Sequence, residues 1–171
     1  MPEIEIVNVV ATADLEQPVD LVEISKLPYK IYSPEKMGGR VVYLKTPSMK
    51  GKVSIFSSGK LISVGTKSPE HARQDLDNTV KILVSEDFIK PVSIVAELRN
   101  IVAVQNIGKT VSLEEMYLVV DCIYEPEQFP GLILRQDKLK VTYLVFSSGK
   151  IVIARALMPL HLSPWVQLDV D

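Results

Sequence analysis

The chain has 171 residues, 47% of them hydrophobic, and a formal net charge of −2. This content suffices for a sizeable core, but no run approaches the ~18 apolar residues of a membrane-spanning helix, and we expect no secretory signal because the first residues carry no basic stretch. Cys122 is the only cysteine, which excludes a disulfide framework and fits a small buried side chain in a reducing compartment.

The small net charge hides an uneven distribution along the chain. Residues 36–67 hold seven basic residues and no acidic one, and residues 132–158 hold five basic residues and one acidic one. A solvated lysine-rich surface would explain either segment alone. A matching excess in both segments favours a functional positive surface.

The first half of the chain reads as a strand, a helix, three strands and a second helix. Asp20 is a candidate N-cap for a short helix that Pro28 ends, and Ser68-Pro69 is typical of the start of a longer one. The sequence SSGK at 57–60 indicates a hairpin turn. The expected strands are 3–12, 39–44, 52–56 and 61–64, and the expected helices are 20–27 and 68–84, the latter with Ala72, Leu76, Val80 and Leu83 on one face.

The second half repeats this order. The sequence IYSPEKMGG at 31–39 returns as IYEPEQFPG at 123–131, 92 residues later, and FSSGK at 56–60 returns at 146–150, 90 residues later. A third pair, VNVV at 7–10 and RNIV at 99–102, is also 92 residues apart, and a loop shortened by two residues explains the change of offset. The expected strands are 92–104, 131–136, 140–146 and 150–154, and the expected helix is 112–122.

Three recurring blocks at nearly constant offset predict a duplicated unit, with a first repeat over 1–91 and a second over 92–171. The pattern predicts an α+β fold in which ten strands join into one curved antiparallel sheet. A two-fold pseudo-symmetric body of this kind suits a ligand that is itself nearly two-fold symmetric, such as duplex DNA. The strand VTYLVF at 141–146 is apolar on both sides, so the face away from the helices should bind a partner or a second copy of the chain.

These blocks resemble the TATA-box-binding protein (TBP) family, in its archaeal type. The resemblance covers roughly residues 4–156 and includes YEPEQFPGLILR at 124–135 as well as the repeated blocks above. It implies a TBP-like saddle whose concave sheet face grips the minor groove of DNA and whose helices lie on the convex face. It also implies that the chain kinks DNA with apolar wedges, the device for which this family is the established example.

The resemblance also implies which residues contact DNA. The four wedges match Met37 and Phe56 in the first repeat and Phe129 and Phe146 in the second; Met37 departs from the usual phenylalanine. The pair at the middle of the groove floor matches Asn8 and Asn100. Apolar floor contacts match Val10, Ile62, Val102, Leu144 and Val152, with Ser54 as the partner of Leu144; Val64 and Ala154 replace expected hydroxyl residues; and phosphate contacts match Lys60, Arg135 and Lys150.

Two further parts of the chain concern partners. Glu125, Glu127 and Gln128 match the loop, or stirrup, that binds a transcription factor IIB-type protein in this family. The closing helix of the second repeat would begin near Met158-Pro159, but Pro164 disrupts it, so we expect that helix to be degenerate or absent. The apolar residues of 157–171 would then lie over the sheet, form a dimer contact or bind another protein.

The function expected from these observations is a general transcription initiation factor that binds and bends A/T-rich promoter DNA through the minor groove and recruits the IIB-type factor. The alternative is a divergent paralogue that acts mainly through protein contacts, with weak or no DNA binding. An enzyme is not expected, because His71 and His161 have no metal-ligand spacing around them and no nucleophile or phosphate-binding motif occurs; no metal or cofactor is implied. The expected location is the cytoplasm, with the nucleoid, for an archaeal protein and the nucleus for a eukaryotic one.

Overall fold

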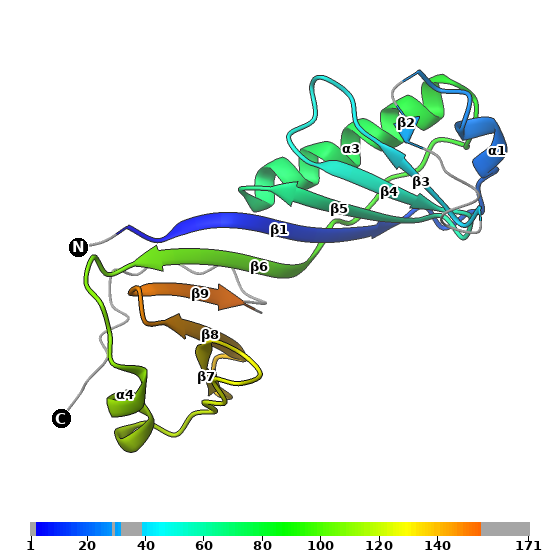
Figure 1. Cartoon of the computed structure of the whole chain (residues 1–171). Helices are drawn as coiled ribbons and strands as arrows, with labels where there is room; N and C mark the ends of the chain where they lie inside the picture. Colours follow the sequence, from blue (N-terminus) through cyan, green and yellow to red (C-terminus); the bar gives the residue numbers. More distant parts are fainter. Residues whose placement is uncertain (1–2, 29, 32–38, 155–171) are drawn as a thin grey trace.

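One antiparallel sheet organises the chain. A computed structural model describes residues 3–28, 30–31 and 39–154, and in this part nine strands pair in the order β2-β3-β4-β5-β1-β6-β9-β8-β7 (Figure 1). The strands are β1 (Glu5–Asp14), β2 (Lys30–Ile31), β3 (Val41–Leu44), β4 (Lys52–Phe56), β5 (Lys60–Thr66), β6 (Glu97–Asn106), β7 (Gly131–Gln136), β8 (Val141–Phe146) and β9 (Lys150–Ala154). The helices are α1 (Leu21–Ile24), α3 (Pro69–Ser85) and α4 (Leu113–Val119).

Strands β1 and β6 pair in the middle of the sheet and join its two halves. In Figure 1 the half with α1 and α3 lies at the upper right and the half with α4 at the lower left. We expected ten strands; the described residues form nine, and an isolated bridge between Ile123 and Ile133 occupies the place that β2 holds in the first half. Met37, the region of the closing helix and residues 157–171 lie outside the described residues.

The helix starts predicted from the sequence are confirmed. The Asp20 carboxylate accepts the Val22 N–H at 2.8 Å, and the Ser68 hydroxyl accepts the His71 N–H at 3.1 Å with Pro69 in the first turn. Both caps satisfy backbone donors that have no partner within the helix itself. The chemistry of capping therefore fixed where these helices begin.

Three boundaries differ from those expected. Strand β6 begins at Glu97 instead of residue 92, and the preceding Ile94 and Ala96 pack against the core from a segment without regular structure. Helix α4 ends at Val119 instead of residue 122, because Val120 takes an extended backbone conformation with φ −121° and ψ 137°. Helix α1 is a single turn that ends at Ile24.

The core lies on the face of the sheet that α3 covers. Alternate residues of β1 point into it, with Val9, Ala11 and Ala13 all buried. The face of α3 predicted from its periodicity is buried against them, and burying each of its larger side chains stabilises the fold by roughly 2 kcal/mol. The buried α3 side chains are Ala72, Leu76, Val80 and Leu83.

The duplication extends to individual hydrogen bonds. In each half, the turn before the last strand is fastened to the segment that follows the first strand, by the same backbone donors and acceptors. The equivalent pairs are Leu15 N–H to Gly59 O (3.0 Å) and Ile107 N–H to Gly149 O (3.0 Å), and Val19 N–H to Ser57 O (3.0 Å) and Val111 N–H to Ser147 O (2.9 Å). Two sequences with limited identity therefore build the same turn.

This turn requires glycine for two reasons. Gly59 and Gly149 have φ values of +91° and +82°, in the region that other residues rarely adopt. A Cβ at Gly149 would also lie 2.0 Å from the carbonyl oxygen of Lys109, and one at Gly59 would lie 2.1 Å from that of Gln17.

Replacing Gly149 with alanine should therefore lower the free energy of unfolding by about 3 kcal/mol, the combined cost of the positive φ and the clash with backbone. Gly108→Ala is the matched control, since Gly108 has a φ of +74° but nothing within 4 Å of its added Cβ. We expect that variant to lose only about 1 kcal/mol. Equal losses in denaturant titrations of the two variants would contradict the clash.

Candidate nucleic-acid interface

The face of the sheet opposite α3 is a continuous surface of mostly apolar, half-buried side chains. Register places one row of side chains across each half, and the two rows are equivalent under the 92- and 90-residue offsets. The rows are Thr12, Ile62, Ser54 and Tyr43 in the first half and Val104, Val152, Leu144 and Ile133 in the second. All are half-buried except Ser54, which is buried.

The residues singled out from the sequence lie on this same face. Strand alternation puts the described ones on the side away from α3, and none of them is buried. They are Asn8, Val10, Phe56, Lys60, Ile62, Val64, Asn100, Val102, Phe129, Arg135, Leu144, Phe146, Lys150, Val152 and Ala154. The fold thus brings together residues that are far apart in the chain.

The centre of this face carries two asparagines in a crossed arrangement. Asn8 stands opposite Val102, and Val10 stands opposite Asn100. The Asn8 side-chain oxygen accepts the Gly65 N–H at 2.9 Å. Because that oxygen is engaged by a backbone donor, the Asn8 side chain presents its NH₂ donors to whatever lies on the face.

A pair of aromatic rings marks the outer part of the second half. The centroids of Phe129 and Phe146 are 5.7 Å apart with the ring planes at 64°, an edge-to-face contact. Gly131 makes room for them, since a Cβ there would lie 2.8 Å from Phe129 and 3.2 Å from Phe146. Phe56 occupies the position equivalent to Phe146 in the first half, while the partner expected there, Met37, lies outside the described residues.

The loop before Phe129 is exposed and acidic. Glu125, Glu127 and Gln128 are all exposed, and the Glu125 carbonyl accepts the N–H groups of both Gln128 and Phe129 at 2.9 Å. These bonds hold the loop in a compact turn. At its base the Tyr124 hydroxyl donates to Glu114 at 2.9 Å, which raises the pKa of Tyr124.

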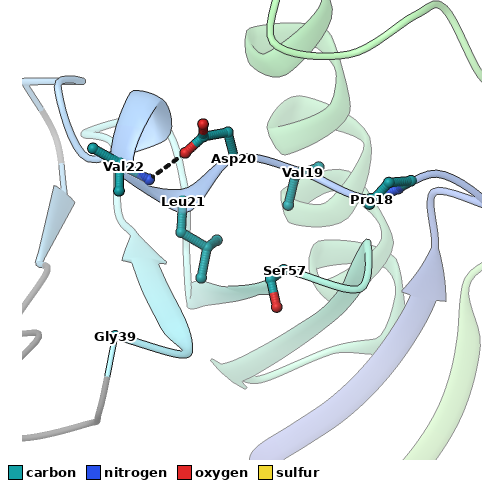
Figure 2. Close-up of a pocket in the computed structure, with 7 residues that line it drawn as sticks. All are labelled: Pro18, Val19, Asp20, Leu21, Val22, Gly39 and Ser57. Carbon is teal, nitrogen blue, oxygen red and sulfur yellow. Dashed lines mark hydrogen bonds between the residues drawn. The ribbon is translucent and has the colours of Figure 1, made fainter.

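The described residues offer little for catalysis. They contain no group of three His, Cys, Asp or Glu side chains able to hold a metal ion, and desolvation raises the pKa of the Cys122 thiol. Figure 2 shows a hollow beside α1 whose one acidic side chain, Asp20, is directed to the Val22 N–H as a cap. None of the described helices is long and apolar enough to cross a membrane.

Comparison with known families decides the identity. The family model described as transcription factor TFIID, or TATA-binding protein (TBP), matches residues 3–85 and 95–163. The chain belongs to the TATA-binding protein family. Its double match agrees with the duplicated hydrogen bonds of the two halves. The TATA-binding protein family consists of DNA-binding transcription factors that are not enzymes, and this chain is not an enzyme.

Curated relatives support this membership over most of the chain. The TATA-box-binding protein of Methanocaldococcus jannaschii is 40% identical over 156 residues, which is 89% of this chain and 83% of that protein. That of Cenarchaeum symbiosum is 38% identical over 155 residues, 90% of this chain and 85% of the relative. A solved structure of Methanococcus jannaschii TBP superposes with a TM-score of 0.78 at 34% identity, covering 92% of this chain and 90% of that one. The fold is the saddle of the TBP family.

Sequence reasoning missed several residues on this face. They complete the rows across the sheet, and the signal that finds them is strand alternation, since each lies two positions from a residue already identified or directly across from one. The additional residues are Thr12, Tyr43, Val104, Ile133 and Thr142.

The orientation of the Asn8 amide can be tested directly. In Asn8→Leu the Gly65 N–H loses its acceptor, so its hydrogen exchange measured by NMR should quicken about fivefold, the equivalent of one net hydrogen bond. Asn106→Leu is the control, because Asn106 accepts the Gly108 N–H at 2.9 Å in the same way. That variant should quicken exchange at Gly108 alone. An unchanged Gly65 amide in Asn8→Leu would show that the Asn8 amide is turned the other way.

Proposed function

We propose that this chain is a general transcription initiation factor that binds A/T-rich promoter DNA through the minor groove, bends it and recruits a IIB-type factor. The observation that carries the proposal is the face opposite α3, where apolar rows flank two central asparagines and an aromatic pair stands at the outer end. The chain's membership of the TATA-binding protein family supports it.

The chemistry of this face suits the minor groove of A·T pairs. That groove presents only the acceptors adenine N3 and thymine O2, whereas a G·C pair adds the guanine NH₂ donor. The Asn8 NH₂ group, with its oxygen already bound to the Gly65 N–H, can donate to such acceptors. The same donors would meet another donor at a G·C pair, which favours A/T-rich sites.

The rings supply the bending. Phe146 and Phe129 form a half-buried pair at the outer part of the second half, where insertion between base pairs unstacks them and kinks the duplex. TATA-binding protein is itself the established example of such a kink, of about 80°. Phe56, with Met37, is the proposed equivalent at the other end of the site.

Cations outside the apolar rows would contact the sugar–phosphate backbone. Lys60, Lys150 and Arg135 are exposed, and the two lysines begin the equivalent strands β5 and β9. Phosphate contacts position the protein without reading sequence. The basic excess in 36–67 and 132–158 supplies the wider positive field.

The proposed partners follow from the surfaces left over. General transcription factors are the partners of this family, and we assign the IIB-type contact to the exposed Glu125, Glu127 and Gln128. In the absence of DNA, the apolar face is the surface through which two copies would associate. We also propose repeat limits at 1–91 and 92–171, and a location with the nucleoid in the cytoplasm of an archaeal cell.

The alternative, a paralogue that works only through protein contacts, is not favoured. Relatives that carry the name TATA-box-binding protein are 35–40% identical to the chain over most of its length. The described residues also keep both central asparagines and three of the four wedge positions.

Truncating one wedge tests the bending. Phe146→Ala should abolish DNA bending, measured by energy transfer between dyes at the two ends of an A/T-rich duplex, while the thermal melting of the protein changes little. Tyr117→Ala is the control, since this exposed aromatic lies on α4. Loss of the fold in Phe146→Ala would show that the ring is part of the core, and normal bending would refute its role as a wedge.

Reversing charge on the acidic loop tests the partner site. Glu125→Lys/Glu127→Lys should leave the complex with DNA intact in a mobility-shift assay and prevent the further shift caused by the IIB-type factor. Glu3→Lys/Glu86→Lys makes the same change of charge at exposed positions elsewhere and should retain that further shift. Equal retention by both double variants would place the partner contact outside the loop.

A further inference from the structure

The two central strands carry a matched pair of β-bulges. The β1–β6 register shifts once between Ile6 and Asn8, which leaves Val7 as the extra residue, and once between Val10 and Ala11, which leaves Arg99 as the extra residue of β6. Val7 and Arg99 are 92 residues apart and are therefore equivalent in the two repeats. A bulge redirects the side chain that it carries.

The Arg99 side chain is held at the face opposite α3. Its Nε donates to the Thr12 hydroxyl at 2.9 Å, and Thr12 belongs to the row of side chains on that face. The guanidinium also pairs with Glu97, and 58% of the side chain remains exposed. Because a guanidinium has five N–H donors, these two contacts orient Arg99 and leave donors for a ligand.

Other cations gather beside Arg99. A hollow beside it is also lined by Asn100, Thr142 and the cations Arg135 and Lys140, with Asp137 as its one carboxylate. Within the part of the chain that the structure describes, the charged ends of Arg135 and Lys140 have no hydrogen-bond or ion-pair partner.

The equivalent region of the first repeat is chemically different. Val7 stands in place of Arg99 and is 36% exposed. Lys45 stands in place of Arg135, but its ammonium donates to the carbonyls of its own loop, at 2.8 Å to Met49, 2.9 Å to Lys50 and 2.6 Å to Gly51. All three donors of Lys45 are therefore occupied. The first repeat has more basic residues, yet at these two positions the available cations belong to the second.

We propose that Arg99 contacts the DNA backbone at the edge of the minor groove and determines which way round the chain sits on an asymmetric site. This inference rests on the proposed function. An A-tract narrows the minor groove and strengthens its negative potential, which attracts arginine. The second repeat, with Arg99 and Arg135 available, therefore lies over the half-site that contains the A-tract, and the first repeat lies over the other half.

The test uses an A/T-rich duplex with an A-tract in one half-site and alternating TA steps in the other. A DNA-cleaving reagent is attached to Glu127→Cys in a Cys122→Ala background, so that cuts report the position of the second repeat. The parent protein should cut mainly on the A-tract side. Arg99→Val should cut both sides about equally and lower the slope of log affinity against log salt by about 1.

Reciprocal variants separate this role from a structural one. Val7→Arg/Arg99→Val should reverse the preferred side, and Arg99→Gln, which keeps a donor for Thr12 without the charge, should behave like Arg99→Val. Glu97→Gln should strengthen binding, because it removes a carboxylate beside the contacted phosphate. An unchanged ratio of cuts in both Arg99 variants would overturn the inference while leaving the proposed function standing. Failure of the parent protein to bind any duplex would overturn both.

Discussion

The pairing of β1 with β6 is the constraint on which the rest of this structure depends. Each half of the sheet ends at one of these strands, and without the pairing both would present an open edge to solvent. Val9 and Ile101 face each other at the centre of the pair and are almost fully buried. Because the two strands are antiparallel copies of one another, their pairing relates the halves by an approximate two-fold axis.

That axis arranges the functional side chains. It sets Asn8 and Asn100 on either side of the centre, extends an apolar row into each half and directs both bulges to equivalent positions. Bulges increase the local twist of a sheet, and twist accumulated over nine strands contributes to the curvature of a saddle. The geometry that joins the repeats is thus also the geometry that fits a bent duplex.

Much of this arrangement could be predicted from the sequence, because the repeated blocks and the caps at Asp20 and Ser68 are local signals. The start of β6 could not, since Ile94 and Ala96 continue the apolar alternation but pack against the core outside any strand. The bulge at Arg99 depends on the register between strands some 90 residues apart, and the use of Lys45 by its own loop depends on loop geometry. Neither leaves a mark in the amino-acid order.

The central claim is that the face opposite α3 reads the minor groove of A/T-rich DNA. The most direct measurement compares affinities for three duplexes of one design, in which the central A·T pairs are retained, replaced by inosine·C pairs or replaced by G·C pairs. An inosine·C pair keeps the minor-groove acceptors of A·T and changes the major groove. Our account predicts near-equal binding to the A·T and inosine·C duplexes and much weaker binding to G·C. Equally weak binding to inosine·C and G·C would contradict it.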